Sequence, residues 1–339
     1  MLAMHVTSAI GNARPPPPLL TFPTQWRRRV EQRQACRRQR LVAAATGPPS
    51  DVFVLDYDGV ICDSEHEVST SALEACCQHW PHLFGSLSDA ERQRVRRGLR
   101  ATRPRLIKGW EALVMARLVL EDDSNVQRIL HDWEPLLERT LAAWGKGDGA
   151  ALAAAFESHR SAQMSGAAAE RWLALNPLYP GVGEALRACP YPFYIASSKA
   201  SSRLVTLLRA GLGMEVEEGS PRIFASLIPP NEKKIAALRE IAQRPTAQGG
   251  ATLHFVDDRY ETMHAIAEQA PDLLSSWKLW LADWGYNTPE ERAAAAALPG
   301  VRLLSRPQFC ELLKWGVVME VDDGCEPTAE EVEAAARQS

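Results

Sequence analysis

The chain has 339 residues, 46% of them hydrophobic and 24% charged, and its formal net charge is −4. No run of about 18 apolar residues occurs, so no membrane span is predicted. A mildly acidic chain does not indicate nucleic-acid binding. The seven cysteines have no CxxC spacing, and we interpret them as reduced thiols.

The first 46 residues differ in composition from the rest of the chain. They contain eight arginines and one acidic residue, Glu31, and they end in the small-residue stretch LVAAAT. An arginine-rich, acid-poor start is typical of an organelle transit peptide. We expect the chloroplast as the destination, with the mitochondrion or cytoplasm as alternatives; a retained, disordered basic tail is the other interpretation of residues 1–46.

The first predicted strand is VFVL, residues 52–55, a short apolar run typical of a buried parallel strand. Residues 66–175 then show helical periodicity without a convincing strand. Within them Val68, Ala72, Cys76 and Trp80 recur every four residues. The stretch 132–135, which ends in a proline, predicts the end of one helix and the start of another.

Strand–helix alternation resumes after residue 176. The predicted strands are PFYIAS (192–197), RIFAS (222–226), TLHFV (252–256), WKLWLADWG (277–285) and VRLLS (301–305). A helix follows each strand, and Asn231 is the predicted N-cap of the helix at 231–242. This alternation predicts an α/β fold with a doubly wound parallel sheet.

The predicted domain organisation is therefore discontinuous. Residues 51–65 and 176–315 form the α/β core, and residues 66–175 form an all-helical second domain inserted after the first strand. Residues 320–339 are acidic and short of large apolar side chains, which predicts a disordered tail.

Polar and charged side chains follow three of the predicted strands and begin one helix between them. In chain order they are Asp56, Asp58, Ser197, Ser198, Lys233, Lys234, Asp257 and Asp258. The carboxyl ends of parallel strands meet at one edge of a sheet, where ligands bind. Carboxylates crowded at such an edge repel one another unless a cation neutralises them, and Mg²⁺ prefers carboxylate and phosphate oxygens. The sequence therefore predicts a Mg²⁺ site that acts on a phosphoryl group.

Each of these features taken alone also has a purely structural interpretation. Asp58 and Gly59 suit a turn, the serines and the later aspartates suit helix caps, and the two lysines suit a solvated helix face. These interpretations do not explain why all the groups meet at one edge of the sheet.

Four segments resemble, in order, the motifs of the haloacid dehalogenase-like (HAD) hydrolase superfamily. They are DYDGVICDS, YIASSKA, the helix that contains Lys234, and HFVDDRYE. The helical insertion after the first motif resembles the helical cap of one subclass, and LADWGYNT resembles a late strand of phosphatase members. The resemblance covers about residues 51–315.

The resemblance implies a role for each matching residue. Asp56 would be the nucleophile that forms an aspartyl-phosphate, and Asp58 the general acid and then the general base. Ser197 would hydrogen-bond a phosphoryl oxygen, with Ser198 as a further substrate contact. Lys234 would neutralise the phosphate; it is favoured over Lys233 because Leu238 follows it by four residues. Asp258, alone or with Asp257, would bind Mg²⁺ together with the Asp56 carboxylate and the Asp58 backbone carbonyl.

An acid two residues after the nucleophile favours phosphoryl transfer over dehalogenation, because an alkoxide leaving group needs a proton and a halide does not. We expect a Mg²⁺-dependent phosphatase that hydrolyses a small phosphorylated metabolite. The alternatives are a phosphotransferase or phosphomutase of the same fold, or a catalytically weak HAD-like binding protein. Arg103, Arg105 and Lys108 are either contacts for a second anionic group of the substrate or solvated loop charges.

Overall fold

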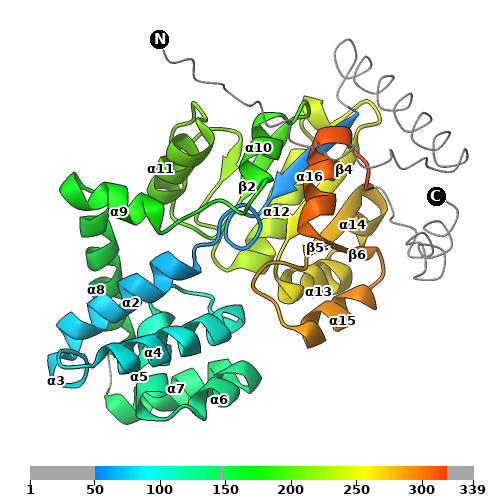
Figure 1. The fold of residues 1–339 in the computed structure, drawn as a ribbon. Coiled ribbons are helices and arrows are strands. Elements are labelled where there is room, and N and C mark those ends of the chain that lie inside the picture. The colour runs from blue at the N-terminus through cyan, green and yellow to red at the C-terminus, as the bar shows by residue number, and fades with distance from the viewer. Residues whose placement is uncertain (1–49, 146–147, 319–339) are drawn as a thin grey trace, which may run out of the picture.

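The structure is a computed structural model, and it describes residues 50–145 and 148–318 (Figure 1). The predicted transit peptide and the predicted acidic tail lie outside the described residues. Within these ranges, no helix combines the length and apolar character that crossing a bilayer requires.

Six parallel strands form one sheet in the order β3-β2-β1-β4-β5-β6. The strands are β1 (Asp51–Leu55), β2 (Phe193–Ala196), β3 (Ile223–Phe224), β4 (Thr252–Asp257), β5 (Trp277–Ala282) and β6 (Val301–Leu304). The predicted α/β fold is confirmed, although β3 is shorter than predicted and β5 ends before Asp283. The strand order reverses between β1 and β4, and a crevice at such a switch point is where open α/β sheets bind ligands.

Helices cover both faces of the sheet. They are α10 (Val182–Arg187), α11 (Ser201–Leu212), α12 (Pro230–Ala242), α13 (Tyr260–Gln269), α14 (Pro271–Ser276), α15 (Pro289–Ala296) and α16 (Arg306–Trp315). Alternate residues of β1 enter different hydrophobic clusters: Phe53 and Leu55 pack on one face, and Val52 and Val54 on the other. A strand buried on both faces is mainly apolar, which explains the VFVL run.

The predicted N-cap at Asn231 is wrong. Helix α12 begins at Pro230, and Pro229 occupies the N-cap position. Proline suits the first turn of a helix because its missing N–H is one of the donors that has no partner there.

Residues 65–174 form a second group of helices, which lies as a separate lobe beside the sheet (Figure 1). The α-helices are α2 (Glu65–His79), α3 (Pro81–Phe84), α4 (Asp89–Thr102), α5 (Glu111–Glu121), α6 (Asn125–His131), α7 (Trp133–Trp144), α8 (Asp148–Gln163) and α9 (Ala169–Ala174), with a 3₁₀ turn η1 at Arg103–Arg105. The break predicted at 132–135 is confirmed between α6 and α7. The lobe has its own hydrophobic cluster, which includes Leu113, Phe156 and the buried Trp133.

The two chain segments that join the lobe to the sheet run side by side. The Asp63 N–H donates to the Pro177 carbonyl at 2.9 Å, and the Tyr179 N–H donates to the Ile61 carbonyl at 3.0 Å. The chain leaves the sheet just after β1, so the lobe is attached at the carboxyl edge of the strands. It therefore lies next to the predicted site.

Candidate active site

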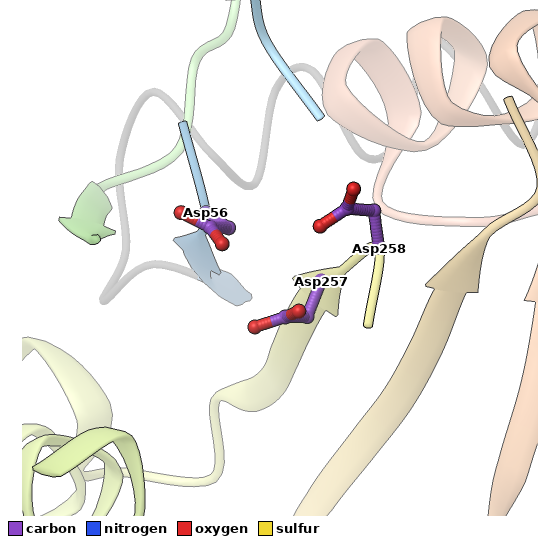
Figure 2. Close-up of side chains that lie close together, drawn as sticks. All are labelled: Asp56, Asp257 and Asp258. Carbon is purple, nitrogen blue, oxygen red and sulfur yellow. The ribbon is translucent and has the colours of Figure 1, made fainter. Parts of the chain in front are cut away.

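Three aspartates from two neighbouring strands form a buried cluster. Asp56 directly follows β1, Asp257 ends β4, and Asp258 comes next. Because Leu55 pairs with Val256, the residues that follow are brought together, and the Asp56 N–H donates to the Val256 carbonyl at 2.9 Å. One carboxylate oxygen from each aspartate lies within 4.8 Å of the others, and Figure 2 shows the three side chains turned toward a common space.

Lys234 links two members of this cluster. Its Nζ lies 2.6 Å from Asp56 Oδ2 and 2.5 Å from Asp257 Oδ2, and its side chain is buried. Burial opposes the positive charge, but the two carboxylates outweigh burial and raise the pKa of Lys234. The ammonium group therefore stays charged, whereas Lys233 is exposed and lies outside the cluster.

The cluster has more negative charge than Lys234 neutralises. Burial, opposed by Lys234, raises the pKa of Asp56 to about 6. Burial together with the neighbouring Asp257 and Asp56 raises the pKa of Asp258 to about 7. Three ionised carboxylates and one ammonium leave a charge of −2, which one divalent cation balances. The donors are all carboxylate oxygens, the ligands that Mg²⁺ prefers, so the residues present fit this ion.

Asp258 is held in place from the loop after β5. Its Oδ2 accepts a hydrogen bond from the Tyr286 N–H at 2.7 Å, and its carbonyl accepts one from Asn287 Nδ2 at 2.8 Å. Gly59 packs against the same carboxylate with a φ of +79°, and a Cβ at this position would lie 1.9 Å from Asp258 Oδ2. Gly59 is therefore required both for its backbone angle and for the space beside Asp258.

The Asp58 side chain does not join the three-aspartate cluster. Its Oδ1 lies 3.2 Å from Lys199 Nζ, and Lys199 is itself buried. Burial would raise the pKa of Asp58, but Lys199 and Arg103 outweigh burial and lower it. The sequence predicts a metal contact for the Asp58 backbone carbonyl and not for its side chain. The position of the side chain outside the cluster is compatible with that prediction, and the side chain lines a cavity.

Ser197 and Ser198 lie at the same edge of the sheet. Ser197 directly follows β2, the neighbour of β1, and is fully buried; its Oγ accepts a hydrogen bond from the Lys199 N–H at 3.3 Å. Ser198 is partly exposed and lines the cavity beside Asp58. Lys199 was not predicted as a site residue, although a lysine two positions after Ser197 in YIASSKA was the available signal.

The cavity has a volume of about 260 Å³ and lies between the sheet and the helical lobe. Residues of the sheet domain on its wall include Asp58, Ser198 and Lys199, and residues of the lobe include Arg103 and Lys108. A group that is bonded to a phosphate at Asp56 can therefore extend past Asp58 into a space bounded by the lobe.

The 3₁₀ turn η1 makes polar contacts between the lobe and the sheet domain. The Arg103 guanidinium stacks 3.8 Å above the centre of the Tyr286 ring. Arg105 Nη1 lies 3.3 Å from Glu261 Oε1 and also pairs with Glu291. Arg105 is thus engaged in holding the lobe against the sheet domain and does not line the cavity.

Comparison with known proteins gives matches among solved structures alone. No protein-family model matches the chain, and no curated protein sequence matches it. The chain is similar to a haloacid dehalogenase-like hydrolase from Streptococcus pneumoniae, with 14% identity over 76% of this chain and 93% of that one and a TM-score of 0.43. It is similar to a hydrolase from Pseudomonas syringae, with 14% identity over 76% and 94% of the two chains and a TM-score of 0.43. A third match is a protein assigned by prediction as a phosphoglycolate phosphatase from Haemophilus somnus, with 13% identity over 80% and 100% and a TM-score of 0.47.

The four segments on which the resemblance rests lie together in the structure. Asp56 and Asp58, Ser197, Lys234, and Asp257 with Asp258 all lie at the carboxyl edge of one parallel sheet. The helical insertion follows the first of these segments. The α/β core with an inserted helical lobe is the architecture that the resemblance implies.

Proposed function

We propose that this protein is a Mg²⁺-dependent phosphatase that hydrolyses a small phosphate ester through an aspartyl-phosphate on Asp56. The observation that supports this proposal is the position of Asp56. It belongs to a buried cluster of carboxylates and pairs with Lys234, and a second acid, Asp58, follows it beside the cavity.

In the first step the Asp56 carboxylate attacks the phosphorus atom. A bond forms between Asp56 and phosphorus, the bond from phosphorus to the ester oxygen breaks, and Asp58 donates its proton to that oxygen. The Tyr57 N–H, 2.6 Å from Asp56 Oδ1, and Lys234 on Oδ2 fix the orientation of the nucleophile.

In the second step water attacks the phosphorus of the aspartyl-phosphate. Asp58 removes a proton from that water, Asp56 is released as a carboxylate, and inorganic phosphate leaves. The ion pair with Lys199 stabilises the ionised form of Asp58, which is the form that this second step needs. The first step needs Asp58 in its protonated form. For Asp58 to take up a proton, the leaving group must weaken the ion pair between Lys199 and Asp58 when it enters the cavity.

Asp56, Asp257 and Asp258 would hold Mg²⁺, which supplies neutralising positive charge at the phosphoryl oxygens when bound. Lys234 adds a fixed positive charge at the same place, and the buried Ser197 hydroxyl provides a hydrogen-bond donor at the edge of β2.

The test is release of inorganic phosphate from 4-nitrophenyl phosphate and from a panel of small phosphate esters, with and without Mg²⁺. We expect Mg²⁺-dependent release by the wild type and none by Asp56→Asn with an unchanged circular dichroism spectrum. Phosphate that appears on an added alcohol rather than in solution would favour the phosphotransferase alternative. Activity in Asp56→Asn equal to that of the wild type would refute the proposal.

For residues 1–46 we propose a cleaved chloroplast transit peptide, supported by their arginine-rich composition. N-terminal sequencing of the native protein tests this, and a mature chain that still begins near Met1 would exclude it.

A further inference from the structure

The cavity beside Asp58 has a wall rich in cations. Seven of its lining residues carry a formal charge at neutral pH: Asp58, Arg103, Lys108, Glu157, Arg160, Lys199 and Arg203. Five are positive and two are negative. The phosphoryl group is expected at Asp56 and Lys234, which do not line this cavity. A group bound at this wall would therefore be a part of the substrate other than the phosphate that is cleaved.

Three of the five cations already have carboxylate partners. These pairs are Lys199 with Asp58 at 3.2 Å, Arg203 with Glu157 at 2.5 Å, and Arg160 with Glu67, in which Arg160 Nε lies 2.8 Å from Glu67 Oε1. Each of these positive charges is matched by one negative charge within the protein. They shape the wall without attracting a further anion strongly.

Arg103 and Lys108 are different, because neither has a carboxylate within 4.0 Å among the residues that the structure describes. Arg103 stacks on Tyr286 at 3.8 Å, and its Nε atom is buried without a hydrogen-bond partner in the described chain. A buried donor without a partner is costly, and a ligand that accepts its hydrogen bond removes that cost. Lys108 is exposed and lies on the same cavity wall.

The cavity is small. Its volume of about 260 Å³ lies below the roughly 300–1,000 Å³ of typical small-molecule pockets. A leaving group of a few heavy atoms fits this space.

On these grounds we infer that the substrate is a short phosphate ester whose leaving group carries a second anionic group, a carboxylate or a phosphate, bound by Arg103 and Lys108. This inference rests on the proposed phosphatase activity and adds the substrate class. Arg105, which the sequence offered as a third candidate, is excluded because it is paired with Glu261 and Glu291.

The test compares three esters of similar size at saturating Mg²⁺. 2-Phosphoglycerate carries a carboxylate, glycerol 2-phosphate has a neutral hydroxymethyl group in its place, and ethane-1,2-diol bisphosphate carries a second phosphate. We expect kcat/KM to be at least about tenfold higher for one of the two anionic esters than for the neutral one, a typical effect of a hydrogen bond to a charged group. The better of the two identifies the second anionic group.

Variants test which residues bind the second anionic group of the substrate. Lys108→Gln should raise KM about tenfold for the preferred anionic ester and leave KM for glycerol 2-phosphate nearly unchanged. Arg103→Gln should raise KM about tenfold more for the anionic ester than for glycerol 2-phosphate. The comparison is relative for this variant because Arg103 also lowers the pKa of Asp58. Lys108→Arg should restore the KM. Arg97→Gln and Lys233→Gln remove exposed cations outside the cavity and should change neither value. Lys108 is exposed, so its variant remains informative if Arg103→Gln does not fold.

The possible failures are distinguishable. Equal kcat/KM for all three esters would overturn the inference and leave the proposed phosphatase intact. If both variants lose the same factor in kcat/KM for anionic and neutral esters, the second anionic group is not bound by Arg103 and Lys108. Absence of phosphate release from every ester and from 4-nitrophenyl phosphate would overturn the proposed function and this inference with it.

Discussion

At the scale of single residues, Lys234 makes the strongest prediction. Lys234→Ala removes the charge that contacts Asp56 and Asp257, so turnover should fall by about 10²-fold or more, a typical cost of losing one electrostatic stabiliser. Lys233→Ala is the matched control, because Lys233 is the exposed neighbour and should retain nearly full activity. Steady-state kinetics with one ester measures both, and the reverse ranking would contradict the role of Lys234.

Gly59 makes a second prediction at this scale. An alanine at this position would place its Cβ 1.9 Å from Asp258 Oδ2 and would displace a carboxylate of the cluster. Gly59→Ala should therefore raise the Mg²⁺ concentration needed for half-maximal activity at least about tenfold, as expected when a metal site loses its orientation.

Gly219 is the control for this experiment. It has a φ of +81°, close to that of Gly59, but no atom lies within 4 Å of the place that a Cβ would occupy. Gly219→Ala thus carries the backbone cost of roughly 1 kcal/mol without the steric clash. A similar Mg²⁺ dependence in the two variants would show that the contact with Asp258 has no role.

The sequence predicted the central residues of this site, but it did not predict the residues that contact them. Asp56, Lys234, Asp257 and Asp258 follow from strand ends and helix register, because such placement is local in sequence. Lys199 and Tyr286 act through contacts with Asp58 and Asp258 that depend on how loops from different strands fold over the edge. The segment YIASSKA places Lys199 near the end of its strand, but nothing in the sequence indicates that its partner is Asp58 or that Tyr286 contacts Asp258.

At the scale of elements, the short turn η1 contributes contacts that hold the lobe against the sheet domain. Arg105→Gln removes the pairs with Glu261 and Glu291, so the lobe should dock less firmly and KM should rise. The free energy of unfolding should fall by roughly 1–3 kcal/mol, because Glu291 is buried and loses its charged partner. Kinetics and urea unfolding of the same variant separate the two effects.

Arg139→Gln is the control for η1. Arg139 pairs with Asp132 inside the lobe, and both side chains are exposed. An equal rise in KM for both variants, or none for Arg105→Gln, would contradict the role of η1 in docking.

Elements were predicted reliably where burial alone decides them. β1 is a continuous apolar run after Asp51, and β4 is mainly apolar, because the sheet is covered on both faces; this pattern is visible in the sequence. β3 has only two paired residues, and its shortness depends on its place at the edge of the sheet. The sequence contains no signal for that place, which is set by the order of all six strands.

At the scale of the whole molecule, the sheet holds a buried histidine that couples stability to pH. His254 Nε2 lies 2.9 Å from Asp51 Oδ1, and Trp280 Nε1 donates to His254 Nδ1 at 3.2 Å. The indole is only a donor, so Nδ1 must be unprotonated and Nε2 carries the hydrogen. Burial, opposed by Asp51, lowers the pKa of His254 in the folded state.

A lowered pKa means that the unfolded chain binds a proton at a higher pH than the folded protein. The free energy of unfolding contributed by His254 is thus fully present above about pH 6.5 and falls as the pH decreases below that value. The loss is at most about 1.4 kcal/mol per pH unit for this one group. Urea unfolding between pH 7 and 5 should show that the free energy of unfolding falls more steeply with decreasing pH for the wild type than for His254→Gln. Equal pH dependence in the two proteins would contradict this role of His254.

The most direct test of the whole account is the detection of a phosphoryl group on Asp56. Asp58→Asn removes the base of the second step, so a substrate with a good leaving group, such as 4-nitrophenyl phosphate, should phosphorylate the enzyme and leave it trapped. Rapid quench of Asp58→Asn with Mg²⁺, followed by peptide mass spectrometry, should place one phosphoryl group on Asp56 and none in the doubly substituted Asp56→Asn, Asp58→Asn protein. Two results would contradict the account, provided that the wild type turns over the substrate. One is an Asp58→Asn protein without a phosphoryl group on Asp56, and the other is a phosphoryl group on a different residue.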